Sequence, residues 1–574
     1  MQQTSPQPNV FATGGTGGLP LRFWVLVVLT GIGTGLGAAA LMLLLRAVQH
    51  AAFSYHSGDF LHAVQRSPYS RRVLVLLGAG ALVGVGRRLL RFAPGGHGGE
   101  LSEAIWFRSG RMPFLQTIAR GALSMVLVGL GASIGREGAP KQTGAAIAGK
   151  LAEWARLSPA QCRLLTACGA GAGMAAVYNV PFGGALFALE VLLGSLALPL
   201  VLPALATSLI ATAVAWISLP AQPTYSVPTY YLAGADIGLA AVVGPLAGLA
   251  SVAYVRAIGW AEARKPQGVW AIATPLLVFA ALGSVAIVYP QLLGNGKDVV
   301  QLAFVGQMAV PLLAAVLILK PLATVACLGS GAPGGLFTPT MTYGAVLGAL
   351  LGHAWAAVWP EAQIGSYAII GAGAVLAAST QGPVSAIVLM LELTRRIDAL
   401  MVPLMLAVAG ATLVARLLDP RSIYSIRIKI GMAAAVPAAP ARTRFDDRIS
   451  DDYATVSSGA PYAAVLEHLL DQSVRGWPLY VLDEHGQLLG EIPARPAGMA
   501  ASASPPLETA TASDLALPVQ ALVSSMSAAD VAARLDAAPA AELPVTDAAS
   551  GRLIGVVRRK RPAGAADQAR LNPG

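Results

Sequence analysis

Six apolar runs in the sequence are each long enough to cross a bilayer, since a spanning helix needs ~20 residues. They lie near residues 23–45, 114–134, 197–218, 237–262, 309–328 and 398–418. Composition agrees, because 55% of the 574 residues are hydrophobic and only 12% are charged, which is too apolar for an ordinary soluble domain. We expect a multi-pass integral membrane protein that is surrounded by the lipid bilayer.

The net charge of +10 does not indicate nucleic acid as a partner. Basic residues such as Arg71, Arg72 and Arg87 flank apolar segments, and positive flanks mark the cytoplasmic side of membrane helices. The first 20 residues are polar and glycine-rich and are expected to form a disordered cytoplasmic tail. The predicted location is the cell (inner) membrane, with both termini in the cytoplasm.

The membrane part repeats itself weakly at an offset of roughly 200 residues. The segment at 171–191 resembles the segment at 371–393, so that Pro181 pairs with Pro383 and Glu190 with Glu392. The segments at 135–145 and 334–345 form a second pair, in the same order, with Pro140 over Pro339 and Gly144 over Gly344. Two ordered pairs predict two related halves.

Each half therefore contains Gly/Pro-rich breaks that are followed by apolar helices, which predicts discontinuous helices. Broken backbone deep in a membrane is tolerated where it is buried in protein or lines a cavity. The free amides at a helix start carry a partial positive charge, so converging helix starts form an anion site. The alternative for a single break is a close helix crossing that requires small residues.

Two of the breaks resemble the signatures of the CLC family of chloride channels and chloride/proton antiporters. GREGAP at 135–140 is similar to the first signature, GREGP, in a GREGxP form, and GSGAPGGLFTP at 329–339 is similar to the second. IYS at 423–425 fits the family's tyrosine near the end of the last membrane helix. The resemblance covers about residues 20–430 and suggests a bacterial, channel-like member.

The resemblance implies roles for individual residues. Glu137 matches the gating glutamate, whose carboxylate occupies an anion site until protonation or a competing anion displaces it; the alternative is a structural pair with Arg136. The other expected anion-binding residues are Gly135, Arg136 and Gly138 of the first signature, Leu336 and Phe337 through their backbone amides, and Tyr424 through its hydroxyl. Tyr424 could otherwise be an interfacial anchor.

Two departures from the family pattern bear on function. The chain reads GGHGGE at 95–100 where the family usually reads GSGIP, so His97 replaces the serine that binds the central anion, unless it only caps a loop. A histidine there predicts altered anion preference or pH-sensitive conduction. Val191 stands where proton-coupled members usually carry a second glutamate, which favours a channel-like or uncoupled pathway over chloride/proton antiport.

A remote alternative is an intramembrane serine hydrolase, because residues 131–135 match G-x-S-x-G around Ser133. That motif needs a strand-to-helix elbow and a histidine base. Ser133 follows an apolar helical run instead, and no histidine has a recognisable partner motif. We therefore expect a protein that is not an enzyme.

After about residue 435 the chain becomes polar, with Ala/Pro-rich linkers. Residues 446–498 and 510–562 each read as a strand, an amphipathic helix and two strands, and both resemble CBS domains. Their ends, GEIPARP and GVVRRKR, lack the aspartate that bonds a ribose in nucleotide-binding pairs. This difference argues against binding of an adenine nucleotide.

The sequence predicts an all-α integral membrane protein, a CLC-type inverted repeat of two halves with broken helices, with a small cytoplasmic α/β CBS-like pair. The expected domains are a tail at 1–20, a membrane domain at 21–431, whose halves are about 21–220 and 235–431, and CBS-like domains at 446–498 and 510–562. The resemblance implies a homodimer and chloride, or a similar small anion, as permeant ligand. No metal and no organic cofactor are expected.

Overall fold

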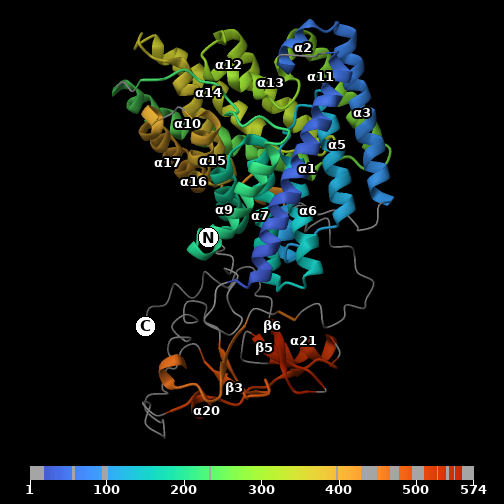
Figure 1. Ribbon diagram of the computed structural model, residues 1–574, viewed down its shortest axis with the longest axis vertical. Helices are drawn as coiled ribbons and strands as arrows, with labels where there is room; N and C mark the ends of the chain where they lie inside the picture. The colour runs from blue at the N-terminus through green and yellow to red at the C-terminus, as the bar shows by residue number, and fades with distance from the viewer. Residues whose placement is uncertain are drawn as a thin grey trace. The chain divides into compact units, whose positions relative to one another are not determined.

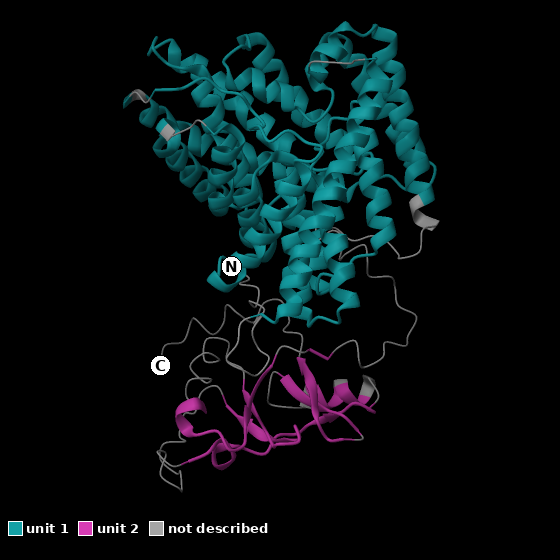
Figure 2. Cartoon of the chain, in the orientation of Figure 1, with its two compact units in different colours: residues 1–435 teal, residues 436–574 magenta. Residues whose placement is uncertain are grey.

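The computed structural model describes most of the membrane part and several segments of the tail. The described residues are 19–54, 59–92, 101–231, 234–395, 398–427, 449–450, 453–465, 478–493, 510–526, 528–537, 542–548 and 550–558. They belong to two compact units, Met1–Ala435 and Val436–Gly574, which are coloured separately in Figure 2.

The first unit is helical, as Figure 1 shows. Its first half contains α1 (Leu21–Phe53), α2 (Phe60–Arg66), α3 (Tyr69–Phe92), α4 (Leu101–Phe107), α5 (Phe114–Gly129), α6 (Gly138–Trp154), α7 (Pro159–Tyr178), α8 (Pro181–Leu186), the π-helix η1 (Phe187–Leu193) and α9 (Leu198–Ala215). Its second half contains α10 (Gly234–Ala263), α11 (Trp270–Val288), η2 (Pro290–Leu292), α12 (Lys297–Phe304), α13 (Val310–Gly329), α14 (Phe337–Ala356), α15 (Ile364–Thr380), α16 (Pro383–Thr394), η3 (Asp398–Leu400) and α17 (Met401–Leu418).

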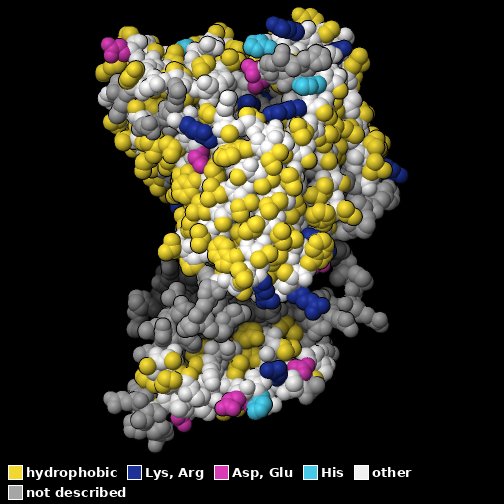
Figure 3. All heavy atoms as spheres, viewed as in Figure 1, with side chains coloured by type: hydrophobic (Ala, Val, Ile, Leu, Met, Phe, Trp, Pro, Cys, Tyr) yellow, Lys and Arg dark blue, Asp and Glu magenta, His cyan; other side chains and the backbone are white. Residues whose placement is uncertain are grey.

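Among the described residues, six helices are long and apolar enough to cross a membrane. They are Leu21–Phe53, Leu198–Ala215, Asp236–Ala263, Trp270–Val288, Val310–Gly329 and Met401–Leu418. Hydrophobic side chains cover the middle of the face of this unit that Figure 3 shows, whereas most charged side chains gather nearer its ends. An exposed apolar belt of this kind is suited to contact with lipid.

The predicted spans differ from these helices at two places. The run at 114–134 contains a helix that ends at Gly129, because the chain turns at Gly131 with a φ of 98° and enters a break. Trp270–Val288 is a span that was not among the six predicted runs, although its apolar sequence is long enough. The rest of the predicted architecture, a helical membrane unit with broken helices, is confirmed.

Paired glycines allow α6 to cross α7 closely in the first half, and α14 to cross α15 closely in the second half. A Cβ at Gly144 on α6 would lie 2.0 Å from the carbonyl oxygen of Gly169 on α7. A Cβ at Gly344 on α14 would lie 2.5 Å from the carbonyl oxygen of Gly371 on α15. Gly144 and Gly344 are the residues that the sequence repeat pairs, so the crossing is built in the same way in both halves.

The two halves also cap each other's helices. The Glu190 carboxylate of η1 accepts hydrogen bonds from the backbone N–H groups of Val384 (3.1 Å) and Ser385 (2.6 Å) in the first turn of α16. The Glu392 carboxylate of α16 accepts from Phe182 (3.1 Å) and Gly183 (2.6 Å) in the first turn of α8. Negative charge is stabilising at a helix start, so each carboxylate satisfies donors of the opposite half.

The second unit contains two small sheets of the same topology. In one, β1 (Ala454–Ser457) pairs parallel with β2 (Leu479–Leu482), which pairs antiparallel with β3 (Leu488–Ile492). In the other, β4 (Leu522–Val523), β5 (Glu542–Thr546) and β6 (Leu553–Arg558) repeat this order, and α21 (Ala528–Ala537) lies between β4 and β5 in sequence. The predicted small α/β fold of the tail is confirmed, and its likeness to CBS domains stays a prediction from the sequence.

The first residues of each tail repeat pack against the sheet of the other repeat. Residues 510–515, including the short helix α20 (Ala512–Leu515), contribute Ala510, Ala512 and Leu515 to the core of the first sheet. Ile449 packs against the core of the second sheet, and Ser450 pairs with Val556 of β6. The two sheets are thereby tied into one unit.

Candidate anion site

Two breaks, one from each half, meet in the membrane unit. The loop between α5 and α6 and the loop between α13 and α14 are joined through Gly135 and Gly335, which exchange backbone hydrogen bonds of 2.8 and 2.9 Å. Both loops begin at glycines of positive φ, Gly131 and Gly331. The starts of α6 and α14 consequently converge on the same place.

The Glu137 carboxylate lies where these helix starts converge. Glu137 is the N-cap residue of α6 and its side chain is completely buried. Its Oε1 accepts a hydrogen bond of 2.6 Å from the backbone N–H of Phe337, the first residue of α14. Its Oε2 accepts from the hydroxyls of Tyr178 at 3.3 Å and Thr338 at 3.4 Å. The two hydroxyls also bond each other, and each has only one proton, so the carboxylate receives the Phe337 amide and one hydroxyl at a time. These are donors of the kind that would bind a small anion.

Glycine is required around this carboxylate. A Cβ at Gly335 would lie 2.1 Å from Oε1 of Glu137, and one at Gly135 would lie 2.2 Å from the same atom. A Cβ at Gly138 would lie 2.8 Å from the backbone nitrogen of Gly335. The three glycines leave room for the carboxylate and for the close approach of the two loops.

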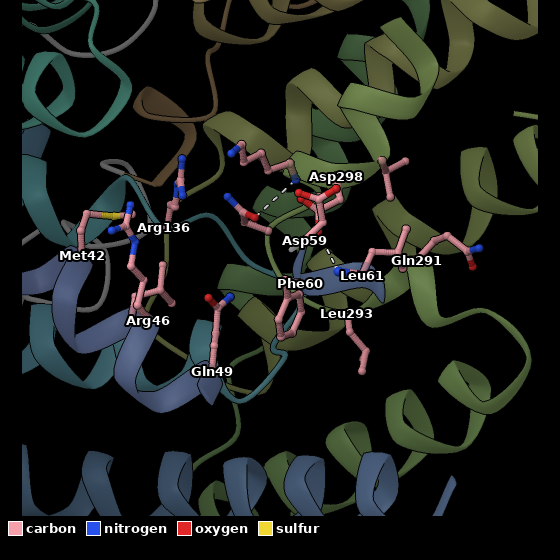
Figure 4. Close-up of a pocket in the computed structure, with 15 residues that line it drawn as sticks. Met42, Arg46, Gln49, Asp59, Phe60, Leu61, Arg136, Gln291, Leu293 and Asp298 are labelled. Atoms are coloured by element: carbon pink, nitrogen blue, oxygen red, sulfur yellow. Dashed lines mark hydrogen bonds between the residues drawn. The ribbon is translucent and has the colours of Figure 1, made fainter. Parts of the chain in front are cut away.

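Arg136 lines a polar cavity. No ion pair joins it to Glu137 among the described residues, and its guanidinium carbon lies 5.1 Å from the centre of the Tyr178 ring. The cavity has a volume of about 310 Å³. In Figure 4, Arg136 and Arg46 of α1 lie on one side of it, with Asp59 and Asp298 on the other. Arg136 thus joins this cavity to the neighbourhood of Glu137.

Two residues close to Tyr424 in sequence hold this segment in place, one of them at the end of α15. The backbone N–H of Ile423 donates to the carbonyl oxygen of Ser379 at 2.9 Å, and Arg427 forms a 2.8 Å ion pair with Glu262 of α10. The Tyr424 ring meets the ring of Phe187 edge to face, with centroids 5.6 Å apart. Its hydroxyl accepts a hydrogen bond of 3.1 Å from the ammonium of Lys141.

Three further polar residues of the site were missed in the sequence: Tyr178, Thr338 and Lys141. A signal for Tyr178 existed, because this tyrosine stands opposite Ala378 in the sequence repeat and follows an apolar run. Lys141 also had a signal, since an ionisable residue inside a membrane helix is a functional candidate by default. Thr338 had no sign beyond its place in the second signature.

Three predicted site residues remain: Leu336, Val191 and His97. Leu336 is the buried N-cap residue of α14, next to Phe337. Val191 lies in η1 and packs against Gly382, the N-cap residue of α16. A Cβ added at Gly382 would lie 2.5 Å from the Val191 side chain. His97 lies outside the described residues.

The serine hydrolase alternative has no geometric support. Ser133 lies in the break before α6, and its buried hydroxyl has no hydrogen-bond partner among the described residues. A nucleophilic serine needs a base within hydrogen-bond reach. The described part of the chain offers none to Ser133.

Comparisons with known proteins identify relatives of this chain. The sequence profile of the family described as "Voltage gated chloride channel" matches residues 78–416. The "Putative chloride channel protein ClcB-like" of Ralstonia nicotianae is 34% identical over 375 residues, which are 62% of this chain and 85% of that protein. The "H(+)/Cl(-) exchange transporter ClcA" of Cronobacter sakazakii is 32% identical over 438 residues, which are 71% of this chain and 89% of the relative.

Solved structures show the same fold. A slow cyanobacterial Cl−/H+ antiporter superposes with a TM-score of 0.65 at 22% identity, over 73% of this chain and all of the other. A eukaryotic CLC transporter superposes with a TM-score of 0.60 at 18% identity, over 94% of this chain and 97% of the other. The matched profile covers more than half of the chain, and the chain therefore belongs to the CLC family of chloride channels and transporters.

Proposed function

We propose that this protein passes chloride, or a similar small anion, along a pathway that Glu137 gates, without obligatory coupling to protons. Family membership makes it a chloride transport protein and not an enzyme. The observation that carries the gate is the buried Glu137 carboxylate on the first amide of α14, at 2.6 Å. A carboxylate held in this way occupies donors that a permeant anion would use.

Opening follows from the charge of the carboxylate. The helix dipole of α14 and the donors around Glu137 stabilise one negative charge at this position. Protonation of Glu137 removes its charge, and an arriving anion competes for the same donors. Either event frees Glu137 to leave, after which the Phe337 amide binds the permeant anion.

The other predicted anion-binding residues keep their roles in this proposal. Gly135 and Gly138 make room for the carboxylate, while Arg136 attracts anions from the polar cavity of Figure 4. The backbone at Leu336 and Phe337 and the Tyr424 hydroxyl bind the anion in turn. We assign His97 to the central anion in place of the usual serine, as a residue whose protonation makes conduction pH-sensitive.

Val191 supports transport that is not coupled to protons. A proton that reaches Glu137 from the other side of the membrane needs an ionisable relay, and valine cannot supply one. The neighbouring Glu190 is occupied with the start of α16, where it accepts hydrogen bonds of 2.6 and 3.1 Å. Chloride/proton antiport is the competing function, and the relative named an exchange transporter favours it.

Liposomes that contain the purified protein separate the two functions. The experiment imposes an outward chloride gradient and follows external chloride and external pH together, with potassium and valinomycin to clamp the voltage. We expect chloride efflux without uphill proton movement. Protons driven uphill by chloride would overturn the uncoupled pathway. Glu137→Gln distinguishes gate-dependent flux from leakage, because it should remove the share of the pH dependence that the gate causes and leave only the share assigned to His97.

The proposal includes the assembly and the surroundings of the protein. We propose a homodimer with one pathway per subunit, in the cell (inner) membrane, with both termini in the cytoplasm. The tail comprises the CBS-like domains 446–498 and 510–562, and we propose that it acts without binding adenine nucleotide. Cross-linking in native membranes tests the dimer, and a dominant monomer band would contradict it.

A further inference from the structure

Lys141 places a cation one helical turn beyond the gating position. It lies four residues after Glu137 on α6, and its backbone N–H donates to the carbonyl oxygen of Glu137 at 3.2 Å. Residues four apart share a face of a helix. The Lys141 side chain is only 4% exposed, so its ammonium is enclosed by the membrane unit.

The ammonium of Lys141 is directed at the tyrosine of the pathway. Its Nζ donates to the Tyr424 hydroxyl at 3.1 Å and lies 4.9 Å from the centre of the Tyr424 ring. It also lies 4.8 Å from the centre of the Phe187 ring. Aromatic faces hold a cation without neutralising its charge, so these contacts position the ammonium beside the hydroxyl.

A second buried lysine shows what a purely structural role looks like in this protein. Lys320 of α13 is 1% exposed, and its Nζ donates to the carbonyl oxygens of Leu292 and Gly294, each at 2.8 Å. Those bonds satisfy the irregular backbone after η2. Lys141 reaches, among its contacts, a side-chain hydroxyl that belongs to the proposed pathway.

We infer that the Lys141 ammonium is an anion ligand of this pathway, which binds the permeant anion together with the Tyr424 hydroxyl. The inference rests on the proposed function and adds an anion-binding residue to it. An ammonium is a compact point charge, and it attracts an anion more strongly than a hydroxyl dipole does. The fixed charge retains the anion and thereby lowers the concentration at which the site fills.

Chloride binding to the purified protein in detergent, measured by isothermal titration calorimetry in chloride-free buffer, tests this inference. We expect Lys141→Met and Lys141→Gln to weaken chloride binding at least tenfold and Lys141→Arg to stay within threefold of the native chain. The matched control is Lys150→Met on the same helix, because Lys150 is partly exposed and paired with Glu153 at 2.8 Å. Binding by Lys141→Met and Lys141→Gln that equals native binding would overturn the inference.

A measurement on the native chain covers the case in which the variants fail to fold. Crystals grown in bromide should show anomalous density within ~3.5 Å of the Lys141 nitrogen, the reach of a direct contact to the donor. Bromide bound along the pathway but away from Lys141 would contradict the inference while leaving the proposed function intact. Failure of the proposed function looks different, because chloride efflux through the native protein would then drive protons uphill or would not depend on Glu137, whatever the Lys141 variants bind.

Discussion

At the scale of single residues, the site depends on small side chains as much as on charged ones. The Glu137 carboxylate fits because Gly135 and Gly335 have no Cβ atom, which would lie within 2.2 Å of its Oε1. The same two glycines join the loops through paired backbone hydrogen bonds. Any added methyl group there competes directly with the carboxylate.

Gly335→Ala tests this competition. The new Cβ would lie 2.1 Å from Oε1 of Glu137 and 2.8 Å from the backbone nitrogen of Gly138. We expect a loss of stability of about 2–3 kcal/mol, as for other overpacked sites. The measurement is the thermal unfolding of the detergent-solubilised protein, followed by size-exclusion chromatography of heated samples.

A double-mutant cycle isolates the contribution of the carboxylate to that loss. In a Glu137→Ala background, Gly335→Ala should cost at least ~1 kcal/mol less, since directly contacting residues couple by this order. Equal costs in the two backgrounds would show that the backbone contact alone is responsible. The control is Gly78→Ala on α3, where an added Cβ meets nothing within 4 Å.

Sequence reasoning reached some residues of the site and missed others for a physical reason. Glu137 and Phe337 lie in the signature breaks, and the structure brings them into contact. Lys141 and Tyr178 belong to regular helices, where a local motif cannot tell which way a side chain points. Only the packing of α6 against distant segments directs Lys141 to Tyr424.

At the scale of elements, the reciprocal caps join the two halves of the repeat. Glu190 receives the first amides of α16 and Glu392 receives those of α8, in both cases at 2.6 and 3.1 Å. The repeat predicted that these glutamates are equivalent. It could not predict the exchange, because a sequence match does not show which half a side chain reaches.

Glu190→Gln and Glu392→Gln should destabilise the membrane unit by similar amounts. Each removes one negative charge from a helix start while keeping one acceptor oxygen, so we expect about 0.5–2 kcal/mol per site. The same thermal assay measures the effect, with Glu153→Gln at the exposed end of α6 as the matched control. A large loss at only one of the two sites would contradict the equivalence of the caps.

The discontinuous helices were the most predictable elements, and the ends of the spans were the least. Gly and Pro mark the breaks before α6 and α14 in the sequence itself. The end of α5 at Gly129 depends on the left-handed turn at Gly131, which hydropathy does not register. The span Trp270–Val288 is long and apolar enough to be predicted from hydropathy, although it was not among the predicted runs.

At the scale of the whole molecule, the two units have separate cores and separate chemistry. The described residues of the proposed pathway all belong to the membrane unit, and the tail has hydrophobic cores of its own. The repeated strand order of the tail was predictable from its sequence. The exchange of Ile449 and residues 510–515 between the two sheets was not, because it depends on contacts between repeats.

The tail contains a carboxylate whose ionisation should limit its stability. Glu491 of β3 is half-buried, and its Oε2 has no hydrogen-bond partner among the described residues. Burial raises the pKa of Glu491 above its ordinary value of 4.5, and the charge of Glu542 raises it further. Glu542 itself is satisfied by the Tyr480 hydroxyl at 3.0 Å and by Arg558 at 2.7 Å.

The raised pKa fixes the direction of the pH dependence. The folded tail holds the Glu491 proton more tightly than the unfolded chain does, so this contribution to stability is complete below pH 4.5 and is lost as the pH rises through the folded pKa. Glu491→Gln should therefore stabilise the tail at pH 7.5 by about 0.5–1 kcal/mol, a small value because the group is partly exposed. The gain should shrink toward pH 5.

Hydrogen exchange of residues 478–493 in the full-length protein measures this gain, compared with the native chain at each pH. Glu484→Gln, in the exposed turn between β2 and β3, is the matched control. It should leave the hydrogen exchange of residues 478–493 unchanged at both pH 7.5 and pH 5. Chloride efflux should stay at the native rate, because the charge lies in a unit that contributes no described residue to the pathway. A gain that persists undiminished at pH 5 would mean that packing of the amide, and not loss of the charge, stabilises the tail.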